Sequence, residues 1–208
     1  MLTLDRIYQA AHTLKGTVRR TDTILCNNLT HDGALYLKTE NLQNTGSFKV
    51  RGAAFKMAML SEAEKAKGVI ACSAGNHAQG VALAAQKAGI QATIFVPSIA
   101  PLSKIEATRR MGAEVRLIDG VYDDAFEAAA AWQQAKGGVF IHPFDDEDVI
   151  AGQGTIGLEL LEQIDGLEAV VVPVGGGGLI SGVAFAVKML HPACKVYGVQ
   201  AAGAGSMA

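Results

Sequence analysis

Four consecutive glycines, Gly175, Gly176, Gly177 and Gly178, carry the clearest chemical signal in the sequence. They follow the apolar run Val170–Val174 and lead into a helical pattern. Glycine allows left-handed backbone conformations, so successive N–H groups can turn toward one point, and a helix N-terminus adds partial positive charge. This combination favours a socket for a phosphate dianion. A tight turn that packs a strand on a helix is the alternative, although such a turn needs only one or two glycines.

Lys49 lies in the segment Gly46–Ala53, in which Ser47 can cap a helix that continues toward Met57. An ammonium group in the first turn is unfavourable, because the helix dipole is positive at that end. This field would lower the pKa of Lys49 and favour the neutral amine, which is the nucleophile that forms a Schiff base. From this segment alone, an exposed lysine with its charge in water remains an open alternative.

A third polar segment follows the apolar run Val69–Cys72 and precedes another helical pattern. It offers backbone N–H groups, the Ser73 hydroxyl, the Asn76 amide and the His77 ring, which suit a carboxylate or a ring oxygen. Ligands of open parallel sheets bind outside the carboxyl ends of the strands, and this loop is at such an end. An ordinary helix cap with a surface histidine is the alternative.

Short apolar runs that alternate with helical periodicity must position these three segments. Several runs are rich in Val and Ile, as is typical of strands buried on both faces. Alternating strands and helices predict an α/β fold with parallel, twisted sheets covered by helices. An acidic run, Asp145–Asp148, precedes a helix expected from Ile150, where carboxylates offset the helix dipole. The expected strands are Ala34–Lys38, Val69–Cys72, Ala92–Val96, Glu114–Ile118, Val139–Ile141, Ala169–Val174 and Lys195–Val199.

The composition narrows the classes of partner and site. The net charge of −2 gives no electrostatic reason to expect a nucleic acid or an anionic membrane, and no apolar run approaches a membrane span. Three scattered cysteines show no metal-ligand spacing, so we expect no metal and a reducing, cytoplasmic setting. Charged residues make up 18% of the chain, below the roughly 25% of typical domains, which suggests a surface buried against another subunit.

Taken together, the segments resemble the threonine dehydratase (threonine ammonia-lyase) and serine dehydratase family of pyridoxal-phosphate enzymes, with the tryptophan-synthase-β-like fold called fold type II. SFKVRGA, SAGNHAQGVA and PVGGGGLISG stand in the family's order and spacing. KTENL at Lys38–Leu42 and AGQGTIGLE at Ala151–Glu159 also fit. The resemblance runs from about residue 1 to 208, and it implies pyridoxal 5'-phosphate (PLP) as the cofactor.

The resemblance assigns roles residue by residue. Lys49 would carry the cofactor as a Schiff base and act as the catalytic base, and Phe48 would lie against the cofactor. Asn76 would hydrogen-bond the ring hydroxyl oxygen. The substrate carboxylate would be held by Ser73, Gly75, Asn76 and His77. The cofactor phosphate would be bound by Gly175, Gly176, Gly177, Gly178 and Leu179.

The implied reaction is a β-elimination. L-threonine, and possibly L-serine, would lose water and ammonia to give 2-oxobutanoate or pyruvate. The resemblance also implies a homodimer and a place in amino-acid metabolism such as isoleucine biosynthesis. A small domain, residues 62–148, would close over the cofactor held by a large domain formed from 1–61 and 149–208.

Three features depart from the resemblance. Ala74 stands where serine racemases of the family have a second serine, and an alanine cannot transfer a proton. Gln200 stands where some members offer a carboxylate to a divalent cation, and an amide is a weaker ligand. Family members also continue beyond Ala208, so we expect the 208 residues to be a C-terminally truncated form with low or no activity alone.

Several alternatives remain at this stage. Serine racemase or serine dehydratase shares the fold, while sulfhydrylases of the same fold carry a different lysine motif of the NPxxSVKDR kind. A non-catalytic PLP-binding subunit is a rival from another class. A nucleotide-binding domain is disfavoured, because the glycine run completes neither a Walker loop nor GxGxxG.

Overall fold

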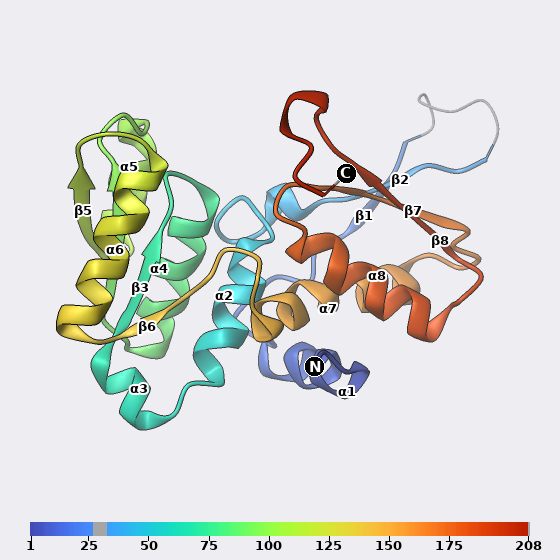
Figure 1. The fold of residues 1–208 in the computed structure, drawn as a ribbon. Coiled ribbons are helices and arrows are strands. Elements are labelled where there is room, and N and C mark those ends of the chain that lie inside the picture. The colour runs from blue at the N-terminus through green and yellow to red at the C-terminus, as the bar shows by residue number, and fades with distance from the viewer. Residues whose placement is uncertain (27–32, 208) are drawn as a thin grey trace.

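A computed structural model of the protein describes residues 1–26 and 33–207, and Figure 1 shows its fold. The helices are α1 (Leu4–Thr13), α2 (Lys49–Ala58), α3 (Glu62–Lys67), α4 (Asn76–Ala88), α5 (Leu102–Arg110), α6 (Tyr122–Lys136), α7 (Glu147–Gln163) and α8 (Gly178–Leu190), with 3₁₀ turns η1 (Glu40–Leu42) and η2 (Ala202–Ala204). The strands are β1 (Thr23–Leu25), β2 (Tyr36–Lys38), β3 (Val69–Cys72), β4 (Ala92–Pro97), β5 (Glu114–Ile118), β6 (Val139–Phe140), β7 (Ala169–Pro173) and β8 (Lys195–Val199).

The predicted α/β fold with helix-covered parallel strands is confirmed in a four-stranded sheet of order β5-β4-β3-β6. Side chains along β3 alternate between its two faces. Val69 and Ala71 join the buried cluster that includes α4 and α5, whereas Ile70 and Cys72 pack with α6. Both faces of this sheet are therefore apolar and covered by helices, as Figure 1 shows on the side coloured green to yellow.

The other strands form two small sheets. β1 pairs with β2 in an antiparallel sense, and β1 was not expected from the sequence. β7 pairs with β8 in parallel, and its Val170 and Val172 pack against α7 and α8. The expectation that Val-rich strands are buried on both faces is wrong for β7. Its Val171 is 62% exposed, so one face of this strand is uncovered by the described residues. No helix in the described part of the chain has the length and apolarity needed to cross a membrane.

Helix α7 is the centre of the remaining layer, between α2 and α8 (Figure 1). It begins at Glu147, three residues before the expected start at Ile150. The expected helix-terminal role of the acidic run is confirmed, since the Asp146 carboxylate caps the helix by accepting from the N–H groups of Asp148 and Val149.

One buried apolar cluster crosses the predicted boundary between the small and large domains. It runs from Ile94 and Ala71 in the four-stranded sheet, through α4 and α2, to Ile7 of α1 and Ala151 of α7. The division of the chain at residues 62 and 148 stays a prediction.

Candidate active site

Lys49 is the first residue of α2, and its amine points at the loop that follows β6. The Nζ atom donates a hydrogen bond to the carbonyl oxygen of Pro143 at 2.6 Å and lies 5.4 Å from the centre of the Phe48 ring. Burial lowers the pKa of the Lys49 amine from its ordinary value to about 8. The expected direction is confirmed, although the cause is burial and not the helix dipole.

The expected cap of α2 by Ser47 is wrong. Phe48 holds the N-cap position in a helical conformation, and no side chain caps the helix. The Ser47 hydroxyl is buried, and it has no hydrogen-bond partner among the described residues. The Phe48 ring packs on the apolar cluster that α7, α8 and β7 share, which fixes the entry into α2.

The glycine run forms the turn between β7 and α8. Gly177 adopts a left-handed conformation with φ of 89°, which favours glycine. A side chain at Gly176 would collide with the Phe144 ring, and a methyl group at Gly178 would lie 2.6 Å from the Phe144 carbonyl oxygen. The N–H groups from Gly175 to Leu179 donate to no acceptor within the described residues. The turn is thus a row of free donors at a helix N-terminus, suited to an anion.

Lys49 and the glycine run contact adjacent residues of one loop. The Lys49 amine is bonded to the carbonyl of Pro143, and Gly176 and Gly178 pack directly on Phe144. Segments about 125 residues apart in the sequence therefore meet at one short loop.

His142, Pro143 and Phe144 form this loop, and the sequence reasoning missed it. The Nδ1 atom of His142 accepts hydrogen bonds from the N–H groups of Phe144 and Asp145, and its ring lies edge-on to the Phe144 ring. Burial lowers the pKa of His142. A signal was available, because the loop follows the carboxyl end of a parallel strand, as the Ser73 loop does.

The Ser73–His77 segment lies beside Lys49. Helix α4 approaches α2 so closely that a methyl group at Gly80 would lie 3.0 Å from the Lys49 carbonyl carbon. Asn76 begins α4, and its Oδ1 atom accepts from Lys104 at 3.4 Å. The Ser73 Oγ atom accepts from the Gly75 N–H at 3.1 Å.

The His77 side chain does not join these groups. Its ring is 4% exposed, and Nε2 lies 2.8 Å from the carbonyl oxygen of Ile141. Burial lowers the pKa of His77 to about 4, so the ring is neutral at physiological pH and Nε2 is the donor. Only the backbone N–H of His77 is left for a ligand at the start of α4.

Comparison with known proteins identifies the class that this fold and site define. Residues 14–208 match the family model described as "Pyridoxal-phosphate dependent enzyme", and the chain belongs to that family. The site fits such a cofactor, because an amine with a lowered pKa and a glycine turn with free N–H donors contact one loop. In the described residues no cluster of three or more His, Cys, Asp or Glu could hold a metal ion.

Individual relatives have more narrowly defined activities than the family model. The chain is 57% identical over 209 residues to the L-threonine ammonia-lyase of Thermotoga maritima, with 100% of this chain and 52% of that protein covered. Maize serine racemase matches with a TM-score of 0.92 and 37% identity, covering 95% of this chain and 60% of that one. The processed threonine deaminase isoform 2 of Solanum lycopersicum gives a TM-score of 0.91 and 41% identity, covering 98% and 61%. The chain spans about half the length of the first two curated relatives that it matches.

Proposed function

We propose that this chain forms the PLP-binding part of an ammonia-lyase that eliminates water and ammonia from L-threonine, and also from L-serine. The observation that carries the proposal is the convergence of the Lys49 amine and the glycine run on Pro143 and Phe144. The similarity to the L-threonine ammonia-lyase of Thermotoga maritima supports threonine as the substrate.

Each role follows from a group already described. The N–H groups from Gly175 to Leu179 hold the cofactor phosphate, and Lys49 binds the cofactor aldehyde. Phe48 supports the start of α2, and the Asn76 amide binds the ring hydroxyl oxygen. The substrate carboxylate is bound by the Ser73 hydroxyl and at the Gly75 turn, through the N–H groups of Asn76 and His77.

The bound cofactor supplies an electron sink for the bond that breaks at the substrate Cα. Lys49 moves the proton at that carbon. With a pKa of about 8, roughly a tenth of its amine is neutral at pH 7 and able to accept a proton, far more than for an ordinary lysine. The Pro143 carbonyl holds the free amine close to the glycine run.

An absorbance spectrum of the purified chain mixed with PLP tests this proposal. We expect a visible band that borohydride abolishes, and peptide mass spectrometry should place the reduced cofactor on Lys49. Lys49→Ala should remove the band, while Lys136→Ala, in the exposed last turn of α6, should leave it. A band that survives in Lys49→Ala would overturn the assignment.

Serine racemase is the second candidate, because the maize enzyme shares the fold at 37% identity. Ala74 argues against it, since a methyl group in the loop before α4 cannot transfer a proton. Comparing the rates at which the purified protein with PLP forms 2-oxobutanoate, pyruvate and D-serine separates the candidates. We expect the two oxo acids and no D-serine.

The oligomeric state, the cellular location and the domain motion belong to the same proposal. We propose a homodimer in the cytoplasm with a role in amino-acid metabolism, including isoleucine biosynthesis, and closure of residues 62–148 over the substrate. The low charged fraction of 18% supports a subunit interface. Light scattering of the purified protein tests the dimer.

A further inference from the structure

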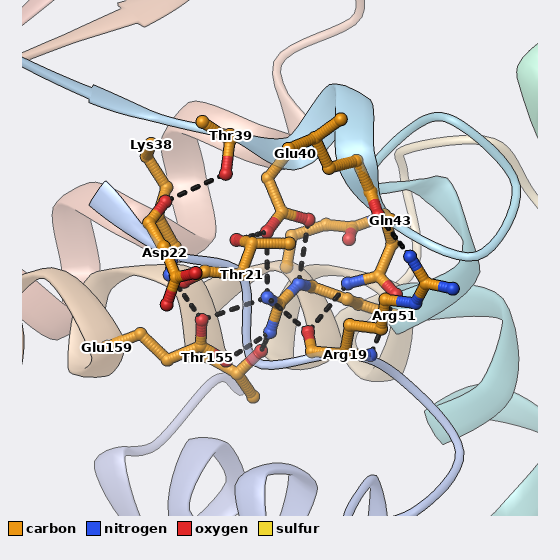
Figure 2. Close-up of polar contacts among 12 residues, drawn as sticks. Arg19, Thr21, Asp22, Lys38, Thr39, Glu40, Gln43, Arg51, Thr155 and Glu159 are labelled. Carbon is orange, nitrogen blue, oxygen red and sulfur yellow. Dashed lines mark hydrogen bonds and ion pairs between the residues drawn. The ribbon is translucent and has the colours of Figure 1, made fainter. Parts of the chain in front are cut away.

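A buried ion network surrounds Arg51 in the first turn of α2 (Figure 2). Its centre is Arg51, whose side chain is 1% exposed. The guanidinium donates to both carboxylate oxygens of Glu40, at 2.9 and 2.8 Å, and to both of Glu159, at 2.6 and 2.9 Å. It also donates to the Thr155 hydroxyl at 3.1 Å and to the Arg19 carbonyl at 3.2 Å.

The partners of Arg51 come from three separate parts of the chain. Glu40 belongs to η1, Glu159 and Thr155 belong to α7, and Arg19 lies between α1 and β1. Lys38 adds a second cation, with its Nζ atom bonded to Glu159 at 2.5 Å, to the Thr21 carbonyl and to Gln163. The network therefore balances two cations against two carboxylates, and it fastens α2 to elements far away in the sequence.

Arg51 and Lys49 leave α2 in opposite directions. An α-helix turns about 100° per residue, so side chains two positions apart point about 200° from each other. Lys49 reaches Pro143 on one side, while Arg51 reaches Glu40 and Glu159 on the other. Rotation of the first turn about the helix axis would move the Lys49 amine and break the Arg51 contacts together.

Backbone contacts hold the same turn without fixing the direction of Lys49. A methyl group at Gly52 would lie 2.7 Å from the Val149 carbonyl oxygen, and one at Gly152 would lie 2.6 Å from the Gly52 Cα atom. These contacts let the helices approach closely. The Gly52 N–H also donates to the Gln153 Oε1 atom, but this single bond is long, at 3.3 Å, and defines the direction of the turn only weakly. The bidentate pairs of Arg51 supply that direction, because the guanidinium fork fits a carboxylate in only a few orientations.

We propose that Arg51 is a positioning residue for Lys49: its buried pairs with Glu40 and Glu159 set the rotation of the first turn of α2, and so aim the lysine amine at the Pro143 loop. The role of Lys49 rests on the proposed function, whereas its placement by Arg51 does not. Buried ion pairs add little net stability, so orientation is the more informative consequence to test.

The test measures how readily the Lys49 amine is acetylated by trace acetic anhydride as a function of pH, with peptide mass spectrometry of the whole 208-residue chain. Arg51→Met removes the fork, and Arg51→Lys keeps its charge without the planar geometry. Lys38→Met is the matched control, since it removes a buried cation of the same network whose hydrogen bonds go to Thr21, Glu159 and Gln163 and not to α2. Far-UV circular dichroism selects conditions in which every variant is folded.

We expect the midpoint of Lys49 acetylation to rise by about one pH unit in Arg51→Met and by part of that in Arg51→Lys, because a loosened amine reaches water. Lys38→Met should keep the wild-type midpoint. Equal shifts in Arg51→Met and Lys38→Met, or no shift in either arginine variant, would overturn the proposal. If Arg51→Met does not fold, the comparison of Arg51→Lys with Lys38→Met decides.

A second measurement links the result to the cofactor. Borohydride reduction with PLP should attach several-fold less cofactor to Lys49 in the arginine variants than in the wild type and in Lys38→Met. Equal attachment in all four chains would count against the proposal. Absence of attachment in the wild type would contradict the proposed function alone, since the acetylation midpoints still decide the role of Arg51.

Discussion

Two buried hydroxyl groups near the start of α2 differ in their hydrogen bonding. Ser47 is 6% exposed and its Oγ atom has no partner in the described residues. Thr155 is 2% exposed, donates to the Gly152 carbonyl at 2.7 Å and accepts from Arg51. A buried polar atom without a hydrogen-bond partner lowers the free energy of unfolding by about 1–3 kcal/mol. Removing one member of an existing hydrogen bond creates such an atom in the other member.

We therefore predict opposite effects on the free energy of unfolding. Ser47→Ala should raise it by up to about 1 kcal/mol, because an unsatisfied group is removed. Thr155→Val should lower it by about 1–2 kcal/mol, because the Gly152 carbonyl and Arg51 each lose a partner. Urea denaturation of both variants measures the difference. A destabilised Ser47→Ala chain would mean that the hydroxyl has a partner in solution.

His77 should give the fold a pH dependence. The folded ring titrates at about 4 because it is buried, whereas an unfolded histidine titrates near 6.5. Between pH 4 and 6.5 the ring is protonated in the unfolded chain but neutral in the folded one. The contribution of His77 to the free energy of unfolding is therefore full above about pH 6.5 and decreases as the pH falls toward 4. The slope contributed by this one group is at most about 1.4 kcal/mol per pH unit.

Replacing the ring tests this linkage. In urea titrations between pH 4 and 7, His77→Gln should be less stable than the wild type at pH 7 and should lose part of the wild-type slope. Replacement of the exposed His12 is the control and should leave the slope in place. A His77→Gln chain with the full wild-type slope would assign the pH dependence to other groups.

At the scale of elements, α7 is held by glycines that allow close helix crossings. A methyl group at Gly152 would lie 2.6 Å from the Gly52 Cα atom in α2, and one at Gly157 would lie 2.9 Å from the Ala186 Cβ atom in α8. The AGQGTIGLE segment thus serves helix packing on two sides of α7.

We predict that Gly152→Ala lowers the free energy of unfolding by about 1–3 kcal/mol, since backbone on both helices must move apart. Gly203→Ala, where a methyl group meets nothing within 4 Å, is the matched control and should change little. Thermal unfolding followed by circular dichroism measures both. Equal stability of the two variants would show that the α2–α7 crossing can relax without cost.

Local patterns predicted most of the elements. β3, β5 and β8 have the expected bounds, because apolar patterns and flanking turn residues mark them. β1 was missed, since three residues carry too little pattern. The start of α2 was misplaced because Phe48 packing, and not a Ser47 cap, decides where the helix begins.

The candidate site was predicted only where its residues form continuous motifs. Lys49 and the glycine run were found, but Pro143 and Phe144, which join them, have no motif of their own. Glu40 and Glu159 meet Arg51 only after three separate segments have folded together. Such long-range pairing leaves no periodic trace in a single sequence.

At the scale of the whole molecule, burial is uneven. Residues Val149–Leu158 of α7 are mostly buried between α2 and α8, and β3 and β4 are covered on both faces. By contrast, β1 and β2 have three residues each, and Ile24 and Leu37 are both 50% exposed. Two-stranded sheets of this length are marginal in water, so opening should cost little there.

Hydrogen exchange followed by mass spectrometry should reproduce this gradient. The amides of Val149–Leu158 and of β3 should exchange most slowly, at rates that approach those of global unfolding, because their opening exposes the shared apolar cluster. The amides of β1 and β2 should exchange fastest among the strands. Arg51→Lys should speed exchange at the start of α2 more than in β3, since only the former loses a direct contact. Uniform exchange across β1, β3 and α7 would instead mean that the chain opens as a single unit.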